Sequence, residues 1–450
     1  MNVLPPLRIE SLAHGGDGVA TLPAGKKVFV PATAPGDLVE AEALEDRGSL
    51  VKARLVRLIE PSAQRVEALC PHAASCGGCQ LQHLAYEAQA AAKEQAFYES
   101  LARIGGLRRE AIAEARPIVA SPDEFRYRIR CRLHVRDGKL GYLRRGSHDL
   151  EPIASCHLLA PALERLALAV GAALRARPLP ALREVDLCVG ADGRGAIALS
   201  PDPKAAPGWA EKAPRIFDGL EGLAGIVALP PPQQQAGQQT KRRRAAPPGA
   251  APAPRIFGDP VVERPAPLAP GVRLLGRPDV FAQANDAGNE ALVRAAVEAL
   301  APAAGDRVLE LYCGAGNFTF ALAARSAHVT AVEYEGVSLD LARRAAAGAR
   351  IDRIRFVAGD AARVVEGFAA EGQRFDLALL DPPRAGARGL AEALARLGPR
   401  RIAYVSCDPA TLARDLGALH AAGYQARLAV PVDMFPQTYH VEGVVLLERA

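Results

Sequence analysis

The chain has 450 residues, of which 49% are hydrophobic and 23% are charged. This length predicts about three domains, and the composition is that of a globular protein rather than a disordered or fibrous one. The net charge of +5 permits a nucleic-acid partner but does not require one. No apolar run approaches the roughly 18 residues that cross a membrane, and the first residues lack the layout of a signal peptide. We therefore expect a cytoplasmic protein without a membrane partner, in which cysteines are metal ligands or catalytic groups more often than disulfides.

Residues 1–62 contain short β-like runs separated by Gly, Asp and Pro, and HGGDGVA and LPAGKK have the composition of tight turns. About five short strands in such a segment predict a small barrel of the OB type, which commonly binds single-stranded nucleic acid. A barrel with a purely structural role is the alternative. The pattern IESLAHGGDGVA…KVFVPATAPGD resembles the TRAM domain of RNA-modifying enzymes.

Three cysteines lie close together in the chain, Cys70, Cys76 and Cys79, and a fourth, Cys156, follows in ASCHLL. Four thiolates can hold a zinc ion or the corners of a [4Fe–4S] cluster, and spacing alone does not choose between them. A C-x5-C-x2-C spacing is less typical of zinc ribbons, and four unrelated reduced cysteines are the third possibility. The string CGGCQLQ resembles the iron–sulfur site of 5-methyluridine RNA methyltransferases, which implies a [4Fe–4S] cluster.

An Ala- and Glu-rich helix is predicted over residues 86–106, and it is followed by FRYRIRCRLHV at 125–135. Successive side chains of a strand point to opposite faces, so this alternating pattern places four arginines on one face and Cys131 on the apolar face. A solvated face usually mixes signs, whereas a stripe of one sign fits phosphate neutralisation. We therefore interpret four residues as RNA-binding: Arg126, Arg128, Arg130 and Arg132.

The segment 63–258 is expected to form an α+β central domain that carries the cysteines and the arginines. Within it, residues 230–254 are rich in Pro, Gln and Ala and include a KRRR run. Such a segment cannot bury enough apolar surface to become ordered, so we expect a disordered insertion between strands.

From about residue 259 to 450, strand and helix patterns alternate, which predicts a doubly wound parallel sheet. ELYCGAGNF follows a strand, and its glycines let the backbone approach a ligand. This turn is not a dinucleotide fingerprint; it resembles the first motif of class I S-adenosylmethionine methyltransferases, which implies a Rossmann-like α/β fold. The next strands end in Glu333, Asp360 and Asp381, and the ends of parallel strands meet in one crevice.

RIAYVSCDPA, residues 401–410, predicts a buried parallel strand that ends near Cys407, with Pro409 beginning the next helix. A thiol at this end of a sheet can be a nucleophile if its pKa is lowered or its proton is removed. A small buried residue that only fills space is the alternative. Glu442, at the start of the last strand, is a candidate general base or a structural acid.

The motifs ELYCGAGNF, LDPPRAG, YVSCDPATLARD and MFPQTYHVE together resemble the RNA (uracil-5-)methyltransferase family of the TrmA/RumA type. With the TRAM-like start and the CGGC string, the chain is most similar to the RumA-like 23S rRNA enzymes. The resemblance implies that Cys407 is the nucleophile and Glu442 the base. It implies these S-adenosyl-L-methionine contacts: Gln283, Tyr312, Gly314, Asn317, Glu333, Asp360 and Asp381. It implies these cluster ligands: Cys70, Cys76, Cys79 and Cys156.

Two positions depart from the family pattern, with Gln437 where His is usual and Asp408 where Asn is frequent. A carboxylate beside a thiol tends to raise the thiol pKa, so Asp408 is expected to slow the reaction without changing the role of Cys407.

The implied activity is C5-methylation of a uridine in RNA, with rRNA expected before tRNA, through a covalent bond from Cys407 to C6. The target base has to leave its stack to reach the crevice. The same chemistry on tRNA, a non-catalytic RNA-binding protein on a methyltransferase fold, and a small-molecule methyltransferase are the alternatives. We expect a monomer.

Overall fold

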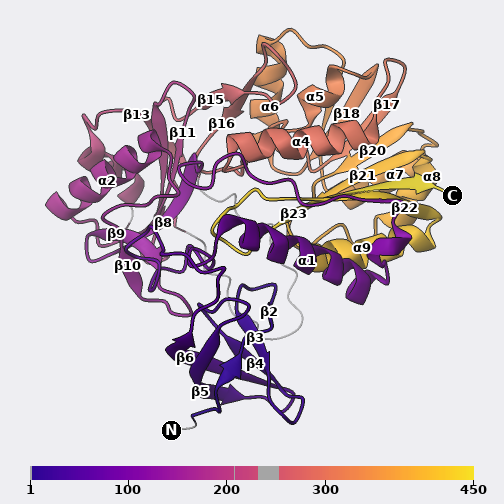
Figure 1. Cartoon of the computed structure of the whole chain (residues 1–450). Coiled ribbons are helices and arrows are strands. Elements are labelled where there is room, and N and C mark those ends of the chain that lie inside the picture. Colours follow the sequence, from indigo (N-terminus) through magenta and orange to yellow (C-terminus); the bar gives the residue numbers. More distant parts are fainter. Residues whose placement is uncertain (1–2, 207, 232–252) are drawn as a thin grey trace, which may run out of the picture.

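The computed structural model describes residues 3–206, 208–231 and 253–450 (Figure 1). Nearly all of the predicted disordered insertion, 230–254, lies outside these residues. None of the helices in the described ranges is long and apolar enough to cross a membrane.

Six short strands form the N-terminal sheet, in the order β1-β5-β6-β4-β3-β2. They are β1 (Leu7–Arg8), β2 (Ser11–Leu12), β3 (Gly18–Thr21), β4 (Lys27–Val30), β5 (Leu38–Asp46) and β6 (Leu50–Glu60). Small and β-branched residues alternate into a core that includes Val28, Val30 and Val39. The order begins at β1 and ends at β2, and within the described part of the chain no ladder joins these two to close a barrel.

The central part contains a seven-stranded sheet in the order β10-β9-β8-β11-β12-β13-β14. Its strands are β8 (Arg130–Arg136), β9 (Lys139–Leu143), β10 (Leu150–Pro152), β11 (Leu182–Val189), β12 (Gly195–Pro201), β13 (Leu223–Ala228) and β14 (Arg255–Gly258). Helix α2 (Pro161–Ala176) buries an apolar stripe against this sheet. The same core includes residues of α3 (Trp209–Lys212) and of the 3₁₀ turn η2 (Ala213–Phe217). Cys131 lies in this core, as predicted.

The predicted strand over 125–135 begins only at Arg130 in the structure. Arg126 has a φ of 59°, in the left-handed region, so the regular alternation cannot extend through it. The expectation that four arginines share one strand face is therefore wrong.

The C-terminal sheet has eight strands in the order β19-β18-β17-β20-β21-β23-β22-β7. They are β7 (Glu114–Ala115), β17 (Arg307–Leu311), β18 (His328–Glu333), β19 (Ile354–Ala358), β20 (Leu377–Leu380), β21 (Arg401–Ser406), β22 (Tyr424–Val432) and β23 (Glu442–Arg449). All neighbouring pairs are parallel except those made by β23, which runs antiparallel to β21 and β22. The predicted doubly wound sheet is confirmed, with one reversed strand.

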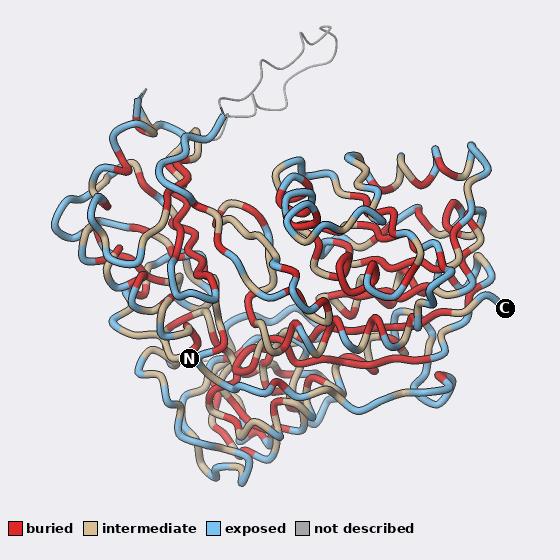
Figure 2. Tube along the Cα trace, turned by 90° about the horizontal axis from the view of Figure 1, so that it is seen from above, coloured by how far each residue is buried: buried red, intermediate tan, exposed pale blue. Residues whose placement is uncertain are grey.

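Helices cover both faces of this sheet, and two separate apolar clusters fill the spaces beneath them. The helices are α1 (Tyr86–Gly105), α4 (Asp286–Leu300), α5 (Thr319–Ala323), α6 (Gly336–Gly348), α7 (Ala361–Ala370), α8 (Ala391–Leu397) and α9 (Pro409–Ala421). A two-stranded ribbon, β15 (Val262–Pro265) with β16 (Arg273–Gly276), packs on α6. In Figure 2 buried segments run through the inside of this part of the molecule, as they do through the central sheet.

Helix α1 forms where the sequence predicts it and ends at Gly105, and the next residue, Gly106, has a φ of 66° that suits a glycine cap. It does not pack on the central sheet. Figure 1 shows α1 alongside α9 and below β22 and β23, and the short 3₁₀ turn η1 (Arg109–Ala111) and β7 follow it along the same sheet. The structure thus differs from the predicted domain division in that residues 86–119 lie against the C-terminal sheet.

Candidate active site

The register of the C-terminal sheet brings the two predicted catalytic residues together. Strands β21 and β23 are antiparallel, and their last pair at this end is Ser406 with Gly443. Cys407 follows directly after the end of β21, and Glu442 is the first residue of β23. Residues that adjoin a cross-strand pair lie at the same end of the two strands. The thiol and the carboxyl therefore share one edge of the sheet, at the end where Asp381 follows β20.

Burial raises the pKa of three groups at this edge of the sheet, Glu442, Asp381 and Cys407. The pKa of Glu442 is raised to about 8 by burial and by the nearby Asp381, and the Arg384 guanidinium opposes the shift. Burial raises the pKa of Asp381 to about 7. Burial, then the charge of Glu442, raises the pKa of Cys407 to about 11, again opposed by Arg384. A cation that enters the crevice would lower all three pKa values, because it stabilises the charged forms.

Asp408 has a structural partner that the sequence did not reveal. Its carboxylate accepts hydrogen bonds from the backbone N–H groups of Ala410 and Thr411, at 3.0 and 2.9 Å, and so caps helix α9. The positive end of a helix offsets a carboxylate placed there. Asp408 does raise the pKa of Cys407, but less than burial and Glu442 do.

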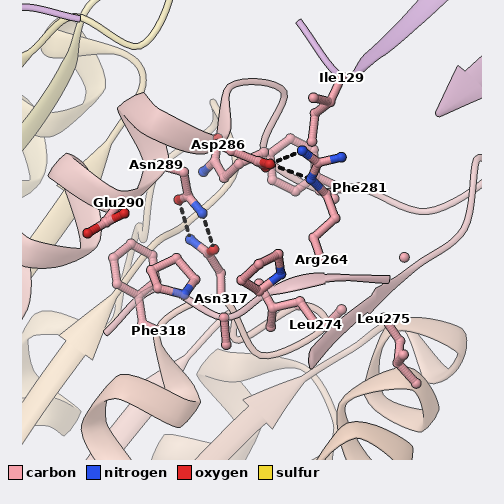
Figure 3. Close-up of a pocket in the computed structure, with 18 of the residues that line it drawn as sticks. Ile129, Arg264, Leu274, Leu275, Phe281, Asp286, Asn289, Glu290, Asn317 and Phe318 are labelled. Carbon is pink, nitrogen blue, oxygen red and sulfur yellow. Dashed lines mark hydrogen bonds and ion pairs between the residues drawn. The ribbon is translucent and has the colours of Figure 1, made fainter. Parts of the chain in front are cut away.

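A cavity of about 680 Å³ adjoins this crevice and lies beside the glycine turn after β17. Its lining includes five of the predicted cofactor residues: Gln283, Tyr312, Gly314, Asn317 and Asp381. Figure 3 shows Asn317 facing Asn289 of α4, and the two side-chain amides exchange hydrogen bonds of 2.7 and 2.9 Å. Arg264, from β15, pairs with Asp286 across the same cavity.

The lining of this cavity includes residues that the sequence did not single out, among them Asn289 and the exposed Phe281. Asn289 is 5% exposed, and its partner Asn317 is 28 residues away in the chain, so no local pattern pairs them. The only available signal was an Asn on the buried side of an otherwise apolar helix face.

Glu333 and Asp360 do not line the cavity. The Glu333 carboxylate accepts a hydrogen bond of 2.9 Å from the backbone N–H of Gly314, so it braces the glycine turn. Asp360 caps α7 by accepting from the backbone N–H of Arg363 at 3.1 Å. Its charge contributes to raising the pKa of Tyr312, after burial, which places it next to the cavity wall.

The four predicted ligand cysteines line a second cavity, of about 300 Å³: Cys70, Cys76, Cys79 and Cys156. The thiol of Cys76 accepts from the backbone N–H of Gly78 at 3.3 Å. Burial, with smaller contributions from the neighbouring thiols, raises the pKa of Cys76 to about 11 and that of Cys79 to about 12. Across the residues described, no three His, Cys, Asp or Glu side chains are arranged to hold a single metal ion.

The four arginines predicted to bind RNA have different surroundings. Arg126 pairs with Glu164, and Arg132 pairs with Asp186 at 2.9 Å on the exposed face of β8. Arg130 donates to two backbone carbonyls, those of Pro278 and Ala282, beside the larger cavity. Arg128 lines the cysteine cavity, with its guanidinium 5.5 Å from the centre of the Phe435 ring. Their contact with RNA stays a prediction.

Comparison with known families identifies both ends of the chain. A family model described as tRNA (Uracil-5-)-methyltransferase matches residues 276–450, and the TRAM domain model matches residues 6–56. The chain is 38% identical to the 23S rRNA (uracil(1939)-C(5))-methyltransferase RlmD of Pseudomonas putida, over 98% of this chain and 93% of that protein. It is 31% identical to the RlmD of Vibrio parahaemolyticus, over 99% and 96% of the two chains.

A solved structure agrees with these matches. The Pyrococcus abyssi tRNA (uracil-54, C5)-methyltransferase, crystallised with S-adenosyl-L-homocysteine, superimposes with a TM-score of 0.70 at 25% identity. The match covers 98% of this chain and 100% of that one. Family model, full-length relatives and fold agree, and the chain belongs to the RNA (uracil-5-)methyltransferase family.

Proposed function

We propose that this protein transfers a methyl group from S-adenosyl-L-methionine to C5 of a uridine in 23S rRNA. The observation that supports the proposal is the pairing of Ser406 with Gly443, which brings the neighbouring Cys407 and Glu442 to one edge of the sheet, near a cavity lined by five of the predicted cofactor residues. The names of the relatives from Pseudomonas and Vibrio support rRNA as the substrate.

The reaction follows from one thiol and one carboxyl on the two sides of a flat ring. The Cys407 thiol gives its proton to solvent water, the thiolate sulfur bonds to C6, and the electron pair of the C5–C6 double bond moves into the ring as an enolate. C5 then takes the methyl group, and the donor leaves as S-adenosyl-L-homocysteine. Glu442 removes the proton from C5, the double bond re-forms, and the C6–S bond breaks. The methyl carbon has to lie about 3.5 Å from C5 for this transfer.

The cysteines are proposed to hold a [4Fe–4S] cluster, with Cys70, Cys76, Cys79 and Cys156 as ligands. In such a cluster each thiolate binds a different iron, so the sulfurs lie farther apart than the ligands of a single ion. One common cavity fits that requirement. The glycines also fit, because a Cβ at Gly77 would lie 2.9 Å from the carbonyl oxygen of Leu143. The cluster would fix the cysteine loop against Thr438–His440, and methyl transfer itself needs no electrons from it.

The metal assignment is tested by anaerobic purification of the wild type and Cys79→Ser. We expect about four irons and four sulfides per chain in the wild type and a clear loss in the variant. A preparation that contains zinc in place of iron would overturn the cluster.

The donor-dependent activity is tested with labelled S-adenosyl-L-methionine and transcripts of 23S rRNA and tRNA. We expect label in the rRNA transcript and none with Cys407→Ala. A transcript that contains 5-fluorouridine should become covalently attached at Cys407, because fluorine cannot leave as a proton does. Label in tRNA alone would move the proposal to tRNA, and full activity of Cys407→Ala would reject the covalent mechanism. We expect the enzyme to act as a monomer in the cytoplasm.

A further inference from the structure

Helix α1 carries an unusual buried stripe. Gln89, Lys93 and Phe97 are spaced four residues apart, so they lie on one face of the helix, and they are 1%, 3% and 0% exposed. Lysine and glutamine are rarely this buried unless they have specific partners. All three contact the same part of the catalytic sheet, namely the loop 433–441 between β22 and β23 or the start of β23.

Each contact of the stripe is specific. The Lys93 ammonium donates to the Asp433 carboxylate at 2.7 Å and to the Phe435 carbonyl at 3.0 Å. The Gln89 side chain donates to the side-chain oxygen of Gln437 at 3.0 Å and accepts from its backbone N–H at 2.9 Å. The Phe97 ring packs so closely on Gly443 that a Cβ there would lie 2.2 Å from it.

The loop is also held from other directions. Four consecutive backbone carbonyls, 434–437, accept hydrogen bonds from four separate parts of the chain. The donors, in that order, are the side chains of Asn285, Lys93 and Tyr127 and the backbone N–H groups of Gln80 and Leu81. Gln437 has a φ of 71°, a strained conformation for a residue other than glycine, which persists only where the surroundings fix it.

This loop leads directly into Glu442. We propose that Gln89 and Lys93 are positioning residues, which act through loop 433–441 to aim the Glu442 carboxyl at the C5 proton; this rests on the proposed role of Glu442 as the base. A buried ion pair is a poor source of stability, since apolar residues of similar volume often do as well. What the pair of Lys93 and Asp433 provides is a fixed position for the loop.

The order of the chemical steps gives this role a distinct signature. Glu442 acts after methyl transfer, so a displaced carboxyl leaves adduct formation intact and delays release of the product. Ordinary RNA would then accumulate as a covalent adduct through Cys407. A displacement of about 1 Å can slow a step roughly a hundredfold. We expect release to slow about tenfold or more, with the rate of adduct formation and the KM for the donor within about twofold of the wild type.

Two variants test the proposal by different routes. Gln89→Leu removes only neutral hydrogen bonds, and Lys93→Met with Asp433→Asn removes the charges together, so no unpaired charge stays buried. Gln95→Ala, on the exposed side of α1, is the matched control and should behave as the wild type. Single-turnover quenching with labelled donor, resolved on denaturing gels, gives the rates of formation and release.

Glu442→Gln separates the possible failures. If it releases product at the wild-type rate, Glu442 is not the base and the proposed mechanism fails. If it traps the adduct while both α1 variants release normally, the positioning role is overturned and the mechanism stands. If the α1 variants slow formation and release by the same factor, α1 has only a structural role, and the inference is again overturned.

Discussion

The raised pKa of Glu442 predicts that this residue, the proposed general base, destabilises the fold. Below its usual pKa of 4.5 the carboxyl is protonated in both states and has no effect. Between 4.5 and about 8 the unfolded chain ionises while the folded chain keeps the proton, so the free energy of unfolding falls as pH rises. The cost is about 1.4 kcal/mol per pH unit over that window, which gives about 3 kcal/mol at pH 7 and about 5 kcal/mol above pH 8.

Glu442→Gln keeps the size of the side chain and removes the ionisation. We expect it to be more stable than the wild type by about 3 kcal/mol at pH 7, and by nothing at pH 4.5. Urea unfolding of the donor-free protein at pH 4.5, 7 and 8.5 measures this difference. Glu448→Gln, at the far end of the same strand, removes a carboxylate that pairs with Arg401 at 2.9 Å and should give no stabilisation at any pH. A Glu442→Gln difference that is negative, or that does not grow with pH, would refute the reasoning.

Three further predictions concern the same edge of the sheet. Gly443→Ala should cost about 1–3 kcal/mol of unfolding free energy in a urea titration, because the added methyl would overlap the buried Phe97 ring. Gly417→Ala, with open space around it, should cost nothing, and equal effects would contradict the steric account. Asp408→Asn removes a negative charge, so the pKa of Cys407 should fall and its alkylation by iodoacetamide at pH 8 should quicken. The Asn side chain keeps an oxygen that can cap α9, so the free energy of unfolding should change by less than about 1 kcal/mol. S-adenosyl-L-methionine should quicken alkylation of Cys407 more than S-adenosyl-L-homocysteine, which lacks the sulfonium charge. Equal rates would show that the sulfonium charge does not affect the pKa of the thiol.

The alternation of apolar strands with amphipathic helices was enough to predict the C-terminal sheet and the strand that ends before Cys407. It could not predict that β23 lies reversed between β21 and β22. That insertion, and not any local pattern, brings Glu442 to the same edge of the sheet as Cys407, because strand order depends on contacts between segments far apart in the chain.

Local conformation explains where the period-two prediction failed. The alternation of arginines in 125–135 is regular in the sequence, but the positive φ at Arg126 turns the backbone before the strand begins. Helix α1 is a different case, since its existence was predictable and its location was not. The i, i+4 spacing of Gln89 and Lys93 looks like an exposed polar stripe, and only the partners at 433 and 437 show that it is buried.

The charges of the site suit a reaction whose donor is itself a cation. Cys407, Glu442 and Asp381 all have raised pKa values, and the Arg384 guanidinium opposes the shift at Cys407 and at Glu442. A bound sulfonium would lower the thiol pKa and so favour attack on C6. Methyl transfer turns that sulfonium into a neutral thioether. The pKa of Glu442 would then rise again, so that its carboxylate is a stronger base at the step in which, in the proposed mechanism, it takes the C5 proton. The change in donor charge thus favours loss of the Cys407 proton before methyl transfer and removal of the C5 proton after it.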